Sequence, residues 1–254
     1  DSISAEVEAT AQRVGLTTVI AVPVSALTGD NVTESSPSLP WYSGPTLLEL
    51  LDQVEIEPDV DAGARVQVQT ILRTTEFRGY AGVLSSGTLR PGDEIKVAAT
   101  GRTAGVTRLL ARKGEEPVEL DSAVPGQSVA VELDRDIDIT RGDLLSAVAD
   151  APEPANRYSA DVVWLSEEPL AHGRSYILRS GPLEVPTVIT AMRHQLGVIT
   201  GSELASRSLG INDIGRVELA TNNSVTLDAY TRGHDTGGFI LCDRGTGETV
   251  AAGL

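Results

Sequence analysis

The chain of 254 residues is long enough for more than one domain, and its 41% hydrophobic content is typical of a soluble globular protein. Its formal net charge of −16 leaves no basic stripe to neutralise phosphates, which argues against nucleic acid as a partner. No run approaches the roughly 18 consecutive apolar residues of a membrane-spanning helix, so we expect no membrane association.

The N-terminal residues and the cysteine content indicate a location. The segment Asp1–Gln12 is acidic and lacks the basic start and apolar core of a secretory signal. Cys242 is the only cysteine, so no internal disulfide can form, as is usual in a reducing compartment. We therefore expect a cytoplasmic protein.

The first residues carry the pattern of a helix followed by a strand. Apolar residues at helical spacing predict one amphipathic helix, which Gly15 ends. The next segment, Thr18–Val24, is β-branched and almost entirely apolar, which predicts a strand of a parallel sheet covered on both faces. The apolar helix positions are Ile3, Val7, Ala11 and Val14.

A second helix is predicted after a polar loop. Pro45 lies near its start, and leucines 47, 48, 50 and 51 share one face. Helix, strand, loop and helix in this order are the end of an α/β domain. They cannot be a whole one, because a single strand has no sheet to join. We assign residues 1–60 to the C-terminal part of such a domain.

From residue 65 the hydrophobic period changes from helical to alternating. Val66, Val68 and Leu72 fall on one face of the first strand, and short strands with Gly-rich turns follow. That density of turns predicts an all-β barrel or sandwich. The segment Ala151–Pro154 is the best linker in the second half, and a further strand series follows it. We expect β-barrels over residues 61–152 and 153–254.

Side chains that could carry catalysis or bind a metal are not arranged for either role. The three histidines have no metal-ligand spacing, and one cysteine cannot form a thiolate cluster. No Gly-x-Ser-x-Gly nucleophile elbow is present. Glu167 and Glu168 are adjacent, so on a strand they would point to opposite faces. Trp41 and Trp164 are interpreted as packing residues. We predict no catalytic and no metal-binding residue; the histidines are His172, His194 and His234.

An α/β segment followed by two β-barrels is the domain order of the translation-factor class of GTPases. In that class a strand ends in Ser-Ala-Leu or Ser-Ala-Lys. The resemblance implies that a backbone N–H beside the small residue meets the guanine oxygen of GTP. Here the tripeptide is Ser25, Ala26 and Leu27, which we predict to bind guanine. Taken alone, the tripeptide also fits a plain buried strand end.

Longer runs resemble a particular family, the large, GTP-binding subunit of bacterial sulfate adenylyltransferase. They occur in order along nearly the whole chain, and several separate this family from elongation factors. The runs are SALTGDNV (25–32), LPWYSGPTLL (39–48), EFRGYAG (76–82), SGTLRPGDE (86–94), DIDITRGD (136–143), WLSEEP (164–169), GRSY (173–176), NDIGRVEL (212–219) and TGGFIL (236–241).

This resemblance implies a mostly β fold, in which a C-terminal remnant of an α/β P-loop GTPase domain precedes two β-barrels like domains II and III of elongation factor Tu. It implies that the complete subunit binds GTP and Mg²⁺ and hydrolyses GTP. Hydrolysis would drive a separate catalytic small subunit that makes adenosine 5′-phosphosulfate and pyrophosphate from ATP and sulfate in sulfate assimilation. The resemblance also implies an adenylylsulfate kinase as a further partner, either fused, as in some relatives, or separate.

The motifs that would hold phosphate are missing. A P-loop needs Gly-x-x-x-x-Gly-Lys-Ser/Thr, and neither Lys96 nor Lys113 has that context. No Asn-Lys-x-Asp is present to grip the guanine edge, and Asp235–Gly238 is interpreted as a turn and not as a magnesium motif. We therefore expect this fragment alone to be inactive and to bind no GTP.

Two alternatives stay open. One is a translation-type GTPase fragment whose β-barrels bind tRNA, against which the acidity of the chain argues. The other is a β-barrel scaffold with no link to nucleotides. The sequence departs from the family at Arg65-Val-Gln-Val-Gln69, where an aromatic residue is expected in the first barrel strand. This departure bears on packing at the domain junction.

Overall fold

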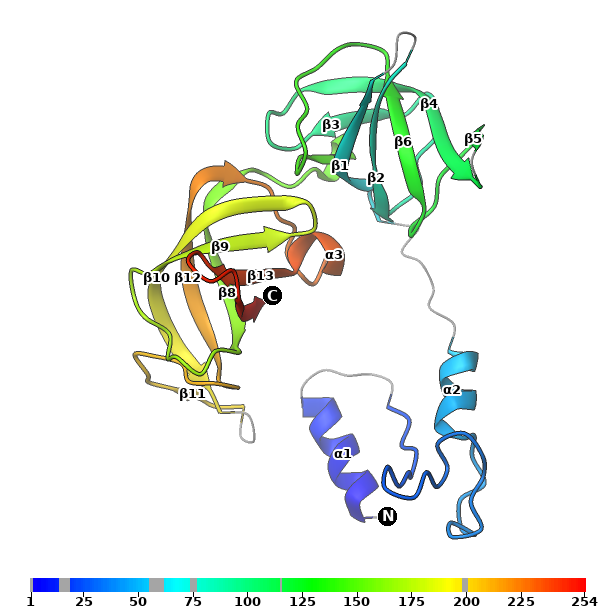
Figure 1. Ribbon diagram of the computed structural model, residues 1–254, viewed down its shortest axis with the longest axis vertical. Coiled ribbons are helices and arrows are strands. Elements are labelled where there is room, and N and C mark those ends of the chain that lie inside the picture. Colours follow the sequence, from blue (N-terminus) through cyan, green and yellow to red (C-terminus); the bar gives the residue numbers. More distant parts are fainter. Residues whose placement is uncertain (1, 14–18, 55–61, 74–76, 115, 198–200) are drawn as a thin grey trace. The chain divides into compact units, whose positions relative to one another are not determined.

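The computed structural model describes residues 2–13, 19–54, 62–73, 77–114, 116–197 and 201–254. Its internal contacts divide the chain into a small unit, Asp1–Glu57, and a larger unit, Pro58–Leu254. The small unit holds two helices, and the larger unit holds two seven-stranded sheets (Figure 1).

The two predicted helices of the small unit are present. The first, α1 (Ser2–Arg13), buries Ala11, whereas Ile3 remains 76% exposed. Val14 and Gly15 lie outside the described residues. The second, α2 (Leu47–Gln53), follows Pro45 and begins with a capping box. In it the Glu49 N–H donates to Thr46 Oγ1 at 3.2 Å, and the Thr46 N–H donates to Glu49 Oε2 at 2.8 Å.

The predicted strand over Thr18–Val24 is wrong for the residues that the structure describes. Residues 19–24 run outside any strand, and Val19, Ile20 and Val24 are exposed. A strand is stable only when its N–H and C=O groups pair with a neighbour. Within the described residues of the small unit there is no second strand to supply that ladder. Residues 19–24 therefore have the composition of a strand but no neighbouring strand among the described residues to pair with.

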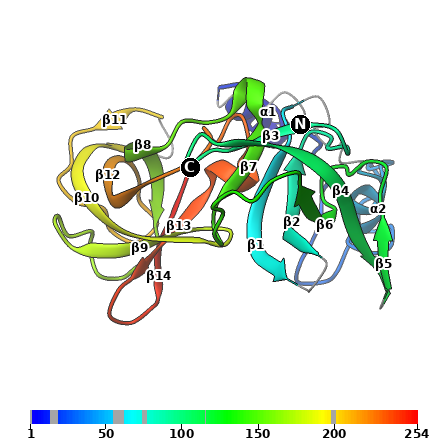
Figure 2. The ribbon, with the colours of Figure 1, turned by 90° about the horizontal axis from the view of Figure 1, so that it is seen from above.

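The first sheet of the larger unit closes into an antiparallel barrel. Its strand order is β3-β7-β1-β2-β6-β4-β5, and an additional pairing of β3 with β4 closes the barrel, with β5 attached to the other end of β4 (Figure 2). Alternate residues fill the interior, where Val68, Leu84, Leu109 and Val131 are fully buried. The strands are β1 (Arg65–Arg73), β2 (Arg78–Ser86), β3 (Glu94–Val97), β4 (Thr103–Lys113), β5 (Glu116–Glu119), β6 (Ser128–Leu133) and β7 (Leu144–Ala147).

The second sheet has the order β11-β10-β12-β8-β14-β13-β9 and closes through an additional pairing of β10 with β9. A single 3₁₀ turn, η1 (Val148–Asp150), precedes it, and a short helix, α3 (His234–Gly237), lies at the predicted turn 235–238. The strands are β8 (Ala155–Trp164), β9 (Ser175–Ser180), β10 (Leu183–Leu196), β11 (Glu203–Leu204), β12 (Ile214–Val225), β13 (Phe239–Asp243) and β14 (Thr249–Gly253).

Trp164 anchors the core of the second barrel. Its ring meets the Tyr176 ring edge to face at 6.0 Å, and its Nε1–H donates to the Glu168 carbonyl at 2.8 Å. Its interpretation as a packing residue is confirmed. The same interpretation is wrong for Trp41, which is 71% exposed in the small unit. The predicted fold class, mostly β with two β-barrels, is confirmed.

β2 lies so close to β1 at Gly82 that the position has no room for a side chain. A Cβ on Gly82 would lie 2.0 Å from the Gln67 carbonyl oxygen, beside the register shift between Val68 and Thr70. Backbone cannot yield as a side chain can, so we expect Gly82→Ala to cost about 1–3 kcal/mol or more of unfolding free energy.

The control is Gly105→Ala, in β4 of the same barrel, where the nearest atom to a Cβ is the Asp134 carboxylate oxygen at 3.2 Å. That side chain can move, so the control should lose less stability. Urea denaturation of both variants measures the difference. Equal losses would contradict the packing argument.

Candidate functional site

The segment that contains the predicted guanine-binding residues forms a tight loop. The Ser25 N–H donates to the Asp30 carbonyl at 3.1 Å, and the Gly29 N–H donates to the Ser25 carbonyl at 2.8 Å. Gly29 has a positive φ angle of 76°, which allows the chain to reverse between Ser25 and Asp30. Asn31, directly after the loop, also has a positive φ angle, of 58°. The apolar run 19–24 therefore ends in a loop with its own backbone hydrogen bonds.

Side chains hold this loop in shape. The hydroxyl oxygens of Ser25 and Thr28 are hydrogen-bonded at 2.7 Å, and the Asp30 carboxylate accepts from the hydroxyls of Ser36 and Thr28. These two hydrogen bonds, that of Ser36 first, hold the pKa of Asp30 below its usual value of 3.8. Asp30 is consequently ionised at neutral pH, and its carboxylate holds the hydroxyls of Ser36 and Thr28 in place.

Asn31 attaches the loop to α2. Its side chain is buried, and its Nδ2 donates to the Pro23 carbonyl at 2.9 Å. The first two N–H groups of α2, those of Leu47 and Leu48, donate to the carbonyls of Asn31 and Val32 at 3.1 and 3.0 Å. The loop therefore satisfies donors that a helix N-terminus leaves unpaired.

Ser25, Ala26 and Leu27 lie together in this loop, but their side chains differ in role. Ser25 faces inward to Thr28, whereas Ala26 is exposed and Leu27 is 96% exposed. Within the described part of the chain, no acceptor meets the backbone N–H of Ala26 or Leu27. The loop thus presents two free N–H donors beside a methyl side chain, an arrangement suited to a planar carbonyl-bearing ligand. Contact with guanine stays a prediction.

The residues that shape this loop were not predicted from the sequence. Asp30, Asn31 and Ser36 make its organising contacts, yet only Ser25, Ala26 and Leu27 were predicted. The Gly29-Asp30-Asn31 run is a turn signal that could have indicated them.

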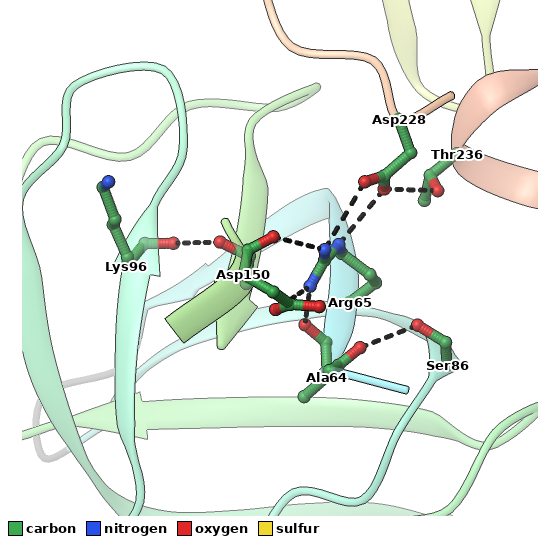
Figure 3. A network of polar contacts seen from close by, with 9 residues as sticks. Ala64, Arg65, Ser86, Lys96, Asp150, Asp228 and Thr236 are labelled. Atoms are coloured by element: carbon green, nitrogen blue, oxygen red, sulfur yellow. Dashed lines mark hydrogen bonds and ion pairs between the residues drawn. The ribbon is translucent and has the colours of Figure 1, made fainter. Parts of the chain in front are cut away.

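A second polar cluster joins the two barrels at Arg65, the first residue of β1 (Figure 3). Its Nε donates to Asp228 Oδ2 at 3.1 Å, and one terminal nitrogen donates to Asp150 Oδ1 at 3.0 Å. The other terminal nitrogen donates to the Asp150 carbonyl at 2.8 Å. One guanidinium thus connects the first barrel, η1 and the second barrel.

The cluster is buried and internally paired. The side chains of Arg65 and Asp228 are 6% and 5% exposed. Asp228 Oδ2 also accepts from Thr236 Oγ1 at 2.7 Å, which fixes the carboxylate from the second-barrel side. Burial lowers the pKa of Arg65, but hydrogen bonds and charge interactions with Asp150 and Asp228 outweigh it, so the pKa is raised overall. The guanidinium therefore stays charged.

Glycines allow the barrels to approach beside this cluster. Gly181, in the β9–β10 turn, has φ +53°, and a Cβ there would lie 2.3 Å from Gln67 Oε1. Gly142 has φ +95°, and a Cβ there would lie 3.3 Å from the Leu183 Cα. The segment 65–69, which the sequence analysis linked to the domain junction, thus supplies both Arg65 and Gln67 to it. The individual partners of these residues were not predicted.

Across the ranges that the structure describes, no group of three or more His, Cys, Asp or Glu side chains could hold a metal ion. In those same ranges, none of the helices has the length and apolar character needed to cross a membrane.

Several known proteins are similar to this chain in sequence. Residues 157–254 match the family model described as GTP-eEF1A C-terminal domain-like. Sulfate adenylyltransferase subunit 1 of Aeromonas hydrophila is 40% identical over all of this chain and 53% of the relative. The same subunit of Vibrio cholerae is 41% identical over 94% of this chain and 50% of the relative. The bifunctional enzyme NodQ of Rhizobium sp. (strain N33) is 38% identical over 94% of this chain and 37% of the relative.

A crystal structure of sup35 complexed with GDP matches with a TM-score of 0.70 and 25% identity, over 95% of this chain and 60% of that chain. The chain is therefore homologous to sulfate adenylyltransferase subunit 1 and folds like translation-factor-like GTPases, so the resemblance found in the sequence is confirmed. This chain spans 37% to 53% of the length of these three curated relatives.

The junction gives a prediction about stability. Arg65→Met leaves two carboxylates without their cation, one of them buried, so we expect a loss of about 3–5 kcal/mol of unfolding free energy. The matched control is Arg179→Met, whose ion pair with Glu184 has the same 3.1 Å separation but is exposed, and which should cost about 0–1 kcal/mol. Urea denaturation compares them, and a loss at Arg65 no larger than at Arg179 would refute the role of the cluster.

The loop gives a prediction about acid titration. Because the folded pKa of Asp30 is depressed, its contribution to loop order is present above its usual pKa of 3.8 and is lost as the pH falls through the folded value. Ser36→Ala removes the largest cause, so the pKa of Asp30 should rise toward 3.8. Carbon-detected NMR of the carboxyl group measures it, with Ser38→Ala as the control. No rise in Ser36→Ala would contradict the assigned cause.

Proposed function

We propose that this chain is part of the GTP-binding subunit of a sulfate adenylyltransferase. In the longer protein, GTP hydrolysis would drive a separate catalytic subunit to join ATP and sulfate into adenosine 5′-phosphosulfate and pyrophosphate. The observation that carries the proposal is homology to sulfate adenylyltransferase subunit 1 at 40% identity along the entire chain. Coupling has a chemical purpose, since the phosphosulfate anhydride is a high-energy product.

The proposal assigns three parts to the chain. Residues 1–60 are the C-terminal part of the GTPase domain, residues 61–152 the first β-barrel and residues 153–254 the second. Two separate hydrophobic cores support the division between the barrels, one within residues 64–145 and one within residues 160–251. The linker Ala151–Pro154 lies between these cores.

Within the first part, the loop 25–30 would contact the guanine base. The free N–H groups of Ala26 and Leu27 would donate to the guanine oxygen, and the small Ala26 side chain would leave room for the base. The phosphates and Mg²⁺ would be held by the part of the longer protein that carries a P-loop. Accordingly this chain alone would bind no GTP, and none of its residues would make or break a bond.

The barrels would serve as lever and docking surface. A GTPase can drive a partner only through a surface whose position differs between nucleotide states. The buried Arg65 cluster supports this role, because it ties the barrels to each other through hydrogen bonds with defined geometry.

A translation-type function is the alternative, and the likeness to sup35 favours it. That likeness has 25% sequence identity, against 40% and 41% for the two sulfate adenylyltransferase subunits. The net charge of −16 also opposes the binding of tRNA. The sulfate function is therefore the one proposed.

The guanine contact can be tested in the longer protein. Ala26→Leu would place a bulky side chain beside the proposed base, so we expect GTP to bind about 1–3 kcal/mol more weakly. The control is Ala5→Leu on the exposed side of α1 in the same unit. Calorimetric titration with GTP and Mg²⁺ measures both variants. Unchanged affinity in a folded Ala26→Leu protein would remove the guanine assignment.

The coupling can be tested with the catalytic subunit of the same organism. Addition of GTP should increase adenosine 5′-phosphosulfate formation by the complex of the longer protein with that subunit, and a non-hydrolysable analogue should not. Formation that is indifferent to GTP would refute the proposed function.

A further inference from the structure

The outer face of the first barrel has an apolar hollow of about 590 Å³. It lies across β1, β2, β6, β4 and β5, which are neighbours in the strand order (Figure 1). Its lining includes Leu72, Phe77, Ala81, Leu110 and Pro117. The solvated face of an antiparallel sheet ordinarily carries polar residues, so this apolar face requires an explanation.

The register of the strands explains why this face is hollow. Ala81 on β2 pairs with Ala130 on β6, and Ala130 pairs in turn with Leu110 on β4. In the next row, Leu72 on β1 pairs with Gly79 on β2. The two alanines thus lie between Thr70 on β1 and Leu110 on β4, and Leu72 stands beside a glycine, so small residues leave the space between the two leucines open. The volume lies within the roughly 300–1,000 Å³ of binding pockets.

Two arginines of β4 lie at the edge of the hollow and differ in their partners. Arg108 Nε lies 2.6 Å from Glu132, and its guanidinium stands over the Phe77 ring at 5.8 Å. Arg112 is exposed, and its Nε donates to the Gly114 carbonyl at 3.1 Å. Among the described residues no carboxylate forms an ion pair with Arg112. A cation that lies beside an apolar hollow without such a partner in the described part of the chain is unusual at a net charge of −16.

We propose that this hollow receives apolar side chains from a segment of the catalytic partner subunit, and that a carboxylate on the same segment pairs with Arg112. The inference rests on the proposed function and assigns the docking surface to one face of the first barrel. A water-excluding apolar pocket with a charged edge is the usual anchor of a protein interface.

The chemistry of the hollow favours a polypeptide over nucleic acid. A nucleic-acid site needs several cations along a groove to displace phosphate counterions. Here one of the two arginines is already neutralised by Glu132, which leaves Arg112. One cation beside aliphatic side chains is complementary to a polypeptide segment in which an acidic residue stands next to aliphatic or aromatic residues.

The affinity of variants of this chain for the catalytic subunit is measured by sedimentation velocity. Leu72→Asp puts a charge into the hollow, and Arg112→Glu reverses the charge at its edge. Both residues are exposed, so the barrel should still fold, and urea denaturation checks this. Arg102→Glu is the matched control, an exposed arginine just before the far end of β4 with the same change of charge.

We expect each hollow variant to weaken the complex about tenfold or more, and the control to change it less than about twofold. The loss in Arg112→Glu should shrink as salt is raised, because it is electrostatic. If the unaltered chain binds and the hollow variants bind as the control does, this inference is overturned while the proposed function stands.

Two other outcomes would also overturn it. If the longer protein binds the catalytic subunit but this chain does not at tens of micromolar, docking by the barrels fails. If a single-stranded RNA oligonucleotide binds the chain and Arg112→Glu abolishes that binding, the hollow is a nucleic-acid site and the translation-type alternative gains support.

Discussion

The larger unit depends on one buried guanidinium that is shared between two carboxylates from different parts of the chain. Arg65 is 163 residues from Asp228 and 85 from Asp150, so its contacts hold together parts of the chain that are far apart in sequence. A buried ion pair contributes little net stability over an apolar replacement, but the loss of one partner is costly. Its main effect here is directional: hydrogen bonds with set geometry define one orientation of the barrels, which apolar contact alone would define less sharply.

Local patterns predicted the parts of the fold that local physics determines. The helical spacing of Ile3, Val7 and Ala11 predicted α1, and alternation from Val66 predicted the first barrel strand. The prediction that Leu72 shares a face with Val66 and Val68 is wrong, because the register shift after Val68 leaves Leu72 exposed. The strand expected over Thr18–Val24 failed because pairing is not local: a β-branched run becomes a strand only beside another strand. The guanine loop was suggested by resemblance, and its shaping residues Asp30 and Ser36 were overlooked.

The junction and the hollow could not be predicted from the sequence for a different reason. Asp228 carries no local signal of burial, and it becomes an inward-facing partner only when β12 and α3 place it against Arg65. The hollow arises because Ala81 and Ala130 meet across β2 and β6, a register that depends on the whole barrel. Alanine at an outward position of a strand is ordinary. Two of them side by side, between Thr70 on β1 and Leu110 on β4, are a feature of the folded sheet only.

Strand β1 connects these two features physically. Arg65 at its start belongs to the junction, and Leu72, seven residues later, lines the hollow, a separation of about 23 Å along an extended strand. β2 pairs with β1 from Arg65 to Arg73, and β7 adds a second ladder over Arg65–Gln67 only. The junction end of β1 is therefore held on both sides, whereas the end that lines the hollow is held by β2. The two ends of β1 differ in chemistry. At the junction the hydrogen bonds of Arg65 are already made within the chain, which stiffens the contact between the barrels. At the hollow, apolar surface and Arg112, which has no ion pair among the described residues, remain available, and their burial would supply free energy for binding.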